Sequence, residues 1–192
     1  MQALILASTS PRRRELLTQA GYPFEVIPPH DSAECGICSR ETPPEMVARL
    51  AYQKAADVAT RTAQGLIVAC DTVAECCGHI LGKPKNRDHA REMLQMMSGR
   101  EHRVYSGLCL WKRPGTEHHV QVDVTRLVMD PISPADLEAY LATDGWEGKA
   151  GAFGYQDGLD WVHIVEGSES NVVGLPLEML EKMLANIQSS PT

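Results

Sequence analysis

The sequence predicts a mixed α/β fold whose sheet is partly antiparallel. Short apolar runs at 3–7 and 66–70 are typical of buried strands, whereas 44–62 has apolar residues at helical spacing. Two longer segments of alternating character, 102–110 and 120–129, flank a turn at Pro114 and Gly115 and predict an antiparallel pair. Helices that alternate with strands, together with hairpins, favour an α/β protein with a mixed sheet.

Composition narrows the class of protein. The chain has 192 residues, of which 43% are hydrophobic, enough for one sizeable core or two small lobes. No apolar run has the length of a membrane span, and the first residues lack the features of a signal peptide, so we expect a cytoplasmic protein without a membrane partner. The net charge of −7 argues against broad nucleic-acid binding and fits a small polyanionic ligand bound by a local cluster of cations.

The first third of the chain contains two expected helices. The strand at 3–7 leads into a helix at 11–20, with Ser10 as N-cap, Pro11 as first helical residue and Gly21 as stop. A strand at 24–27 precedes a polar loop, 28–44, of a length that is usually functional or mobile. The helix at 44–62 then places Lys54 on or beside its apolar face, which is unfavourable for a charge without an anion.

The remaining elements follow in a regular order. The strand at 66–70 ends at Asp71 and Thr72, Gly78 marks a hairpin, and Gly82 to Pro84 closes it. A helix at 88–97 precedes the two long strands, and Ser133 caps a helix at 134–142. A glycine-dense stretch at 145–156, a strand at 161–166 and a helix at 177–186 complete the chain.

Three consecutive arginines, Arg12 to Arg14, occupy the first turn of the first helix. The N-terminus of a helix carries partial positive charge, so cations there cost roughly 0.3–1 kcal/mol each. A strand that leads through small residues into such a helix is a place where backbone N–H groups and guanidinium groups bind an anion. We interpret that anion as phosphate.

Other charged residues support the same interpretation. Taken singly, Asp71 could be a turn residue, Lys83 an exposed turn lysine, and Lys54 a side chain whose charge reaches solvent. Taken together with Arg12 and Arg13, they form a set of cations around a carboxylate. Such a set suits a phosphate ligand and a divalent cation.

The six cysteines give a weaker signal. In a cytosolic chain they are expected to be free thiols. Cys35 and Cys38 have the spacing of a zinc or redox motif, and Cys76 with Cys77 could complete four thiolates. Adjacent cysteines are an unusual second half of a zinc site, so plain thiols are favoured.

The ordered set of short motifs resembles the Maf family of nucleoside triphosphate pyrophosphatases, the septum-formation-inhibitor-like proteins. The resemblance covers about residues 4–184. The motifs that carry it are LASTSPRRRELL (6–17), AYQKA (51–55), CDTV (70–73), LGKP (81–84), MSGREHRV (97–104), KAGAFGYQ (149–156) and VVGLPL (172–177).

The resemblance implies a fold and a reaction. It implies a single domain, 1–192, of two lobes with a central cleft, related to the inosine-triphosphate pyrophosphatases and commonly a homodimer. It also implies a hydrolase of acid anhydrides that cleaves a nucleoside triphosphate between the α- and β-phosphates. The products are a monophosphate and pyrophosphate, and the cofactor is Mg²⁺ or another divalent cation such as Mn²⁺ or Co²⁺.

Roles for residues follow by motif position. Asp71 would be the proton acceptor that activates water. A carboxylate of the long loop would hold the metal, and we choose Glu34, with Asp31 second, because the adjacent acids usual in the family are missing here. The triphosphate would be held by Ser8, Arg12, Arg13, Lys54 and Lys83.

Three positions separate subgroups within the family. Members that act on dTTP and UTP resemble this chain in having Arg12, Thr72 and Gln156, whereas members that act on 7-methyl-GTP carry Trp, Gln and Glu there. A glutamine offers a pyrimidine edge both a donor and an acceptor. The sequence therefore predicts a dTTP/UTP pyrophosphatase, with modified pyrimidine nucleotides and a house-cleaning role as further possibilities. The alternatives are a non-enzymatic nucleotide-binding regulator of cell division, and a zinc or thiol-redox protein.

Overall fold

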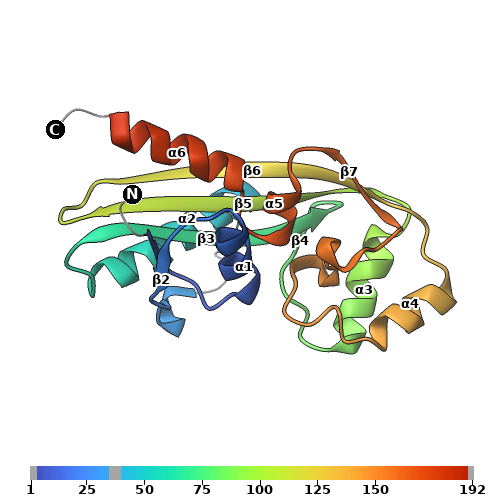
Figure 1. The fold of residues 1–192 in the computed structure, drawn as a ribbon. Coiled ribbons are helices and arrows are strands. Elements are labelled where there is room, and N and C mark those ends of the chain that lie inside the picture. Colours follow the sequence, from blue (N-terminus) through green and yellow to red (C-terminus); the bar gives the residue numbers. More distant parts are fainter. Residues whose placement is uncertain (1–3, 35–39, 190–192) are drawn as a thin grey trace. The chain divides into compact units, whose positions relative to one another are not determined.

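The computed structural model describes residues 4–34 and 40–189, except the side chains of Glu34, Gln188 and Ser189. Figure 1 shows the elements in space. In chain order they are β1 (Leu4–Leu6), α1 (Pro11–Gln19), β2 (Phe24–Val26), the short 3₁₀ helix η1 (Asp31–Glu34), α2 (Pro43–Ala59), β3 (Gly65–Cys76), β4 (His79–Leu81), α3 (Arg87–Met97), β5 (Glu101–Arg113), β6 (His118–Met129), α4 (Pro134–Leu141), η2 (Ala150–Ala152), η3 (Tyr155–Asp157), β7 (Val162–Glu166), α5 (Glu169–Val173) and α6 (Leu177–Ser189).

The strands of the described residues form one seven-stranded sheet in the order β2-β1-β3-β5-β6-β7, with β4 paired to β3. β1 runs parallel to β2 and β3, whereas the pairs β3–β4 and β6–β7 are antiparallel. The prediction of a mixed, partly antiparallel α/β sheet is therefore confirmed.

The chain divides into two compact units, which are described separately. Unit 1 comprises residues up to 71, 106–123 and from 174 onward. Successive side chains along its strands point alternately into two cores, as the two-residue period of a strand requires. One face, with Leu6, Val68 and Leu108, packs against α1 and α6. The opposite face, with Ile5 and Ile67, packs against α2.

Unit 2 comprises residues 72–105 and 124–173. Its core joins Met93, Leu94 and Met97 of α3 to Trp146, Phe153 and the buried face of β6. α3 and α4 lie side by side (Figure 1) and are connected at the surface, where Arg87 and Arg91 both contact Glu138.

Several expected boundaries differ from the structure. The strand expected at 66–70 continues to Cys76, so Asp71 lies inside β3 and the expectation that it follows the strand is wrong. The strand continues because Val73, Ala74 and Cys76 are also buried and β4 pairs with this half. α2 ends at Ala59 instead of residue 62, and the short helices α5, η1, η2 and η3 were not predicted.

Helix starts follow the expected chemistry in part. Ser133 caps α4 by accepting a hydrogen bond from the Asp136 N–H at 3.1 Å. Ser10 occupies the N-cap position of α1, but its side chain makes no capping hydrogen bond there. α2 begins at Pro43, and Glu45 closes its first turn by accepting from the backbone N–H and the hydroxyl of Thr42.

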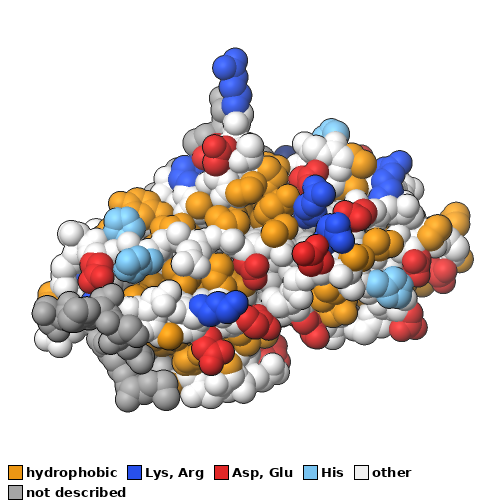
Figure 2. Space-filling model, turned by 90° about the horizontal axis from the view of Figure 1, so that it is seen from above, with side chains coloured by type: hydrophobic (Ala, Val, Ile, Leu, Met, Phe, Trp, Pro, Cys, Tyr) orange, Lys and Arg blue, Asp and Glu red, His pale blue; other side chains and the backbone are white. Residues whose placement is uncertain are grey.

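The surface carries both signs of charge. On the face shown in Figure 2, basic and acidic side chains are interspersed, with apolar side chains between them. Within the described residues, none of the helices combines the length and the hydropathy that crossing a bilayer requires.

Candidate active site

The buried charge of unit 1 is an ion pair between α2 and β3. Asp71 continues the face of β3 that carries Ile67 and Ala69, and this face packs against α2. Lys54 is buried in α2, and its Nζ donates to Asp71 Oδ1 at 2.7 Å. The two side chains are only 6% and 15% exposed. Lys54 therefore does not reach solvent, and the anion that the sequence analysis required beside it is a carboxylate.

Arg13 is held by two polar groups from other parts of unit 1. Its Nε donates to the carbonyl of Gly174 at 2.7 Å, and its Nη1 donates to Ser8 Oγ at 3.3 Å. Ser8 is buried directly after β1, and its Oγ also accepts from the Ser10 N–H at 3.1 Å. The thiol of Cys70 donates to the same Gly174 carbonyl at 3.3 Å. The guanidinium is thus oriented before any ligand arrives.

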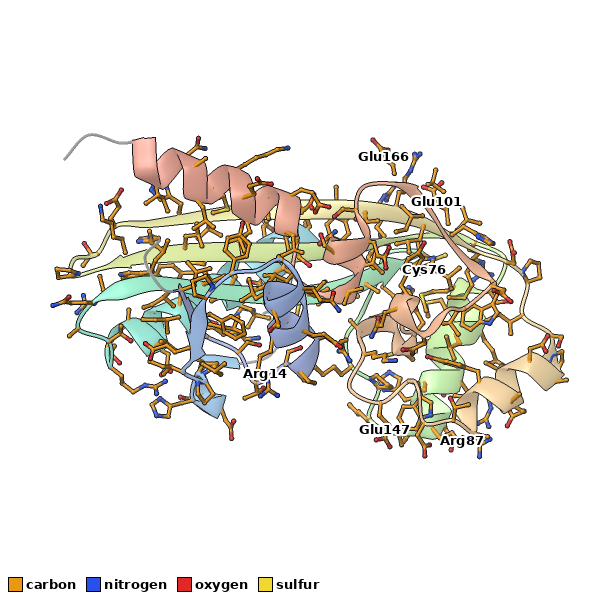
Figure 3. All side chains as sticks on the ribbon, viewed as in Figure 1. Arg14, Cys76, Arg87, Glu101, Glu147 and Glu166 are labelled. Carbon is orange, nitrogen blue, oxygen red and sulfur yellow. The ribbon has the colours of Figure 1, made fainter. Side chains whose placement is uncertain are left out.

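The other two arginines of α1 have different environments. Arg12 is half-buried, whereas Arg14 is exposed. Figure 3 shows Arg14 pointing away from the strands. The first turn of α1 contains no acidic residue, so the helix dipole is not compensated there by the chain itself.

Two of the three predicted site residues of unit 2, Lys83 and Gln156, lie outside the strands and α-helices. Thr72 is half-buried in β3, directly after Asp71. Lys83 is exposed in the turn after β4, and Gln156 is exposed in η3. A backbone hydrogen bond from the Gly151 N–H to the Gly82 carbonyl, at 3.1 Å, connects the Lys83 turn to the segment that carries Gln156.

The predicted metal ligands lie mostly outside what the structure describes. The side chain of Glu34 belongs to that part, as do Cys35 and Cys38, while Asp31 is exposed in η1. Among the described residues, no group of three or more His, Cys, Asp or Glu side chains converges on one point.

The second cysteine pair lies at the β3–β4 hairpin. Cys76 and Cys77 are free thiols whose sulfur atoms are 3.7 Å apart. Burial, together with the hydrogen bond to Cys77, raises the pKa of Cys76 to about 11. A protonated, buried thiol is a weak metal ligand and a weak nucleophile.

Ser8, which orients Arg13, was a predicted site residue, but the Gly174 carbonyl and the Cys70 thiol that bonds to it were not. Gly174 and Cys70 fall within motifs that were matched to the family, VVGLPL and CDTV, but neither was given a role. A backbone carbonyl leaves no signature in a sequence, so only the three-dimensional structure identifies the Gly174 contact.

Comparison with known structures gives the class of fold. The structure is similar to that of a HAM1 protein from Coxiella burnetii, with a TM-score of 0.53 and 15% sequence identity, covering 97% of this chain and 100% of that one. At this identity the likeness shows the fold alone. The chain therefore has a mixed α/β fold similar to that of the HAM1 protein.

Comparison of sequences gives the family. A family model described as "Maf-like protein" matches residues 3–187. A dTTP/UTP pyrophosphatase from Rhodopirellula baltica is 58% identical over 190 residues, which are 98% of this chain and 84% of that protein. A dTTP/UTP pyrophosphatase from Ruminiclostridium cellulolyticum is 38% identical over 188 residues, 97% of each chain. The chain belongs to the Maf family, as the motifs predicted.

Proposed function

We propose that this protein hydrolyses dTTP and UTP to the nucleoside monophosphate and pyrophosphate. The observation that carries the proposal is the 58% identity, over nearly the whole chain, to a relative named for that activity. The buried Lys54–Asp71 pair supports it, because it provides a carboxylate held in one place beside a cation. The chain would work as one functional domain.

Asp71 is the proposed proton acceptor. Lys54 holds Oδ1, so we assign proton transfer to Oδ2. The water oxygen bonds to the α-phosphorus, its proton passes to Asp71, and the bond from that phosphorus to the bridging oxygen breaks. The electron pair of that bond leaves with pyrophosphate. A positioned carboxylate base contributes about 10²–10⁴-fold to such a step.

Cations would stabilise the charge that develops on the phosphate oxygens. Arg13 has the support for this task, since Gly174 and Ser8 hold its guanidinium in one orientation. We assign Ser8, Arg12, Lys54 and Lys83 to the triphosphate as well. Preorganised cations are effective because they do not have to reorganise during the reaction.

The residues at hand suit a hard divalent cation. Glu34, with Asp31 as the second choice, would supply carboxylate oxygen, the donor that Mg²⁺ prefers. When bound, Mg²⁺, Mn²⁺ or Co²⁺ would neutralise phosphate oxygens and lower the pKa of a coordinated water.

We assign selectivity for the nucleobase of the substrate to Arg12, Thr72 and Gln156. The side-chain amide of Gln156 offers both a donor and an acceptor to a pyrimidine edge, and its exposure leaves it accessible to a ligand. Modified pyrimidine triphosphates offer the same edge, so a house-cleaning role fits. We further propose a cytoplasmic homodimer without a nucleic-acid partner.

The test is pyrophosphate release from each nucleoside triphosphate in the presence of Mg²⁺. We expect dTTP and UTP to be the preferred substrates, and Asp71→Asn to lose roughly 10²–10⁴-fold in kcat. Asp88→Asn is the matched control, because Asp88 is an exposed surface residue that is 83% accessible. Full activity of Asp71→Asn would refute the assigned base.

Two other outcomes would favour the alternatives. Submicromolar nucleotide binding without turnover would indicate a regulator. Stoichiometric zinc in protein purified without added metal would indicate a thiolate centre at Cys35, Cys38, Cys76 and Cys77.

A further inference from the structure

The segment from Lys149 to Gly158 has an unusual backbone. Gly151, Ala152 and Gly158 have φ values of 70°, 62° and 72°, in the left-handed region. Ala152 is the notable member, because a residue with a Cβ rarely adopts this conformation without support from its surroundings. The backbone path of this segment is therefore set by contacts with the rest of unit 2.

Three contacts fix the segment. The Tyr140 hydroxyl, which is buried, donates to the carbonyl of Ala152 at 3.3 Å. The Gly151 N–H donates to the Gly82 carbonyl at 3.1 Å. Finally, Lys149 Nζ forms an ion pair with Asp157 Oδ2, which joins the two ends of the segment.

The ion pair crosses directly over Gly154. A Cβ at position 154 would collide with both Lys149 Nζ and Asp157 Oδ2. The φ of Gly154 is −117°, a value that any residue adopts, so a side chain here would act by displacing the ends of Lys149 and Asp157 and not by straining the backbone. The side chains of Lys149 and Asp157 are 13% and 34% exposed, so solvent reaches the pair mainly from the Asp157 side.

We propose that the Lys149–Asp157 ion pair is a positioning device for substrate recognition. Gln156 directly precedes Asp157, so the pair limits where the Gln156 side chain can lie. Gly151, inside the same segment, bonds to Gly82, which directly precedes Lys83. One ion pair thereby constrains the positions of two residues: Gln156, which is assigned to the nucleobase, and Lys83, which is assigned to phosphate. The inference rests on the proposed function.

A purely structural ion pair would behave differently from a positioning pair. Its loss would lower the free energy of unfolding and leave the ratio of kcat/KM for dTTP to that for GTP unchanged. A positioning pair affects KM and this ratio, because both depend on where Gln156 and Lys83 lie. The ratio is therefore the measurement that separates the two roles.

The experiment is a double-mutant cycle with Lys149→Met, Asp157→Asn and the combined variant. We expect each single change to raise KM for dTTP about tenfold, with kcat changed by less than about threefold. The ratio of kcat/KM for dTTP to that for GTP should fall. The combined variant should have the same KM and the same kcat/KM ratio as either single variant, because each single change already removes the whole interaction.

Gly154→Ala tests the same device without removing a charge. Its methyl group displaces the ion pair, so we expect the same rise in KM and the same loss of selectivity. Arg87→Gln is the control, since it removes a more exposed ion pair of unit 2, that with Glu138, and leaves Lys149 and Asp157 in place. If Gly154→Ala fails to fold, the double-mutant cycle alone distinguishes a positioning role of the ion pair from a purely structural one.

Additive effects of the two single changes, or an unchanged dTTP to GTP ratio in variants of an active enzyme, would overturn the inference. A wild-type protein that releases no pyrophosphate from dTTP would instead refute the proposed function, and this inference with it.

Discussion

Unit 1 and unit 2 place the residues proposed for the site in different kinds of structure. In unit 1 the important cations lie on regular elements and have polar partners, as Lys54 does with Asp71 and Arg13 does with Gly174. In unit 2, Lys83 and Gln156 are exposed on turns whose shape depends on neighbouring backbone groups. The difference indicates that the proposed chemistry depends on buried charge, and the proposed selectivity on the conformation of a turn.

Lys54→Met should have the largest effect, because it leaves the Asp71 carboxylate without its cation. Removing one partner of a buried ion pair costs roughly 3–5 kcal/mol of stability. We expect kcat to fall by at least about 10²-fold, because the base and the phosphate both lose a cation. Pyrophosphate release and denaturant unfolding measure the two effects.

The matched variant is Lys54→Met combined with Asp71→Leu. Since it removes both charges, its free energy of unfolding should recover much of the loss while its activity stays absent. If the losses of stability were simply additive, the two residues would not form a coupled buried pair.

Arg13→Lys should have the next largest effect and tests the orientation of the guanidinium. A lysine keeps the charge but cannot donate to Gly174 and Ser8 with the same fork geometry. We expect kcat/KM for dTTP to fall about 10–100-fold. Arg14→Lys is the control, since Arg14 is exposed and should tolerate the change; an equal loss there would contradict the distinction between the arginines.

The parts of the fold that follow from periodicity were predictable. The alternation of β1 and β3 and the apolar face of α2 are visible in the sequence, and they placed Lys54 on or beside that face, where the structure shows it buried. The extent of β3 was not predictable in the same way. Polar Asp71 and Thr72 resemble a strand end, and only the pairing with β4 shows that the strand continues.

The parts of the candidate site that consist of charged side chains were predictable from the sequence. The parts that consist of backbone carbonyls or of an unusual backbone conformation were not. The arginines of α1 and the position of Asp71 next to a cation follow from charge patterns. The carbonyl of Gly174 and the path of residues 149–158 depend on conformations that no residue pattern encodes directly. Ala152 illustrates this, because its left-handed φ contradicts local preference and is stabilised by tertiary contacts such as that with Tyr140.

Gln156→Glu should have a smaller effect, confined to selectivity. Gln156 is exposed, so the change should alter the free energy of unfolding by less than about 0.5 kcal/mol. A carboxylate only accepts hydrogen bonds, so we expect kcat/KM for dTTP to fall about tenfold relative to GTP. An unchanged ratio of kcat/KM for dTTP to that for GTP in steady-state assays would argue against a role of Gln156 in nucleobase selectivity.

His102→Leu should have the smallest effect at neutral pH and tests whether unit 2 tolerates buried charge. His102 is 2% exposed, lies edge-on to Phe153, and neither ring nitrogen has a well-aligned hydrogen-bond partner among the described residues. Burial lowers its pKa from 6.5 to about 4, although the Arg100 backbone and nearby carboxylates oppose the shift. Between these values the unfolded chain binds a proton that the folded chain does not, so stability falls as the pH decreases.

At pH 5 this difference corresponds to about 2 kcal/mol lost relative to pH 7 or above. His102→Leu removes the titrating group, so its free energy of unfolding should depend less on pH between 6.5 and 4, while at pH 7 it stays within about 1.5 kcal/mol of wild type. His163→Asn is the control, because His163 is half exposed beside Asp130 and its loss should leave the acid sensitivity in place. Denaturant unfolding at pH 7 and pH 5 measures both, and an equal pH dependence in His102→Leu and wild type would show that unit 2 accommodates the charged imidazole, as unit 1 accommodates Lys54.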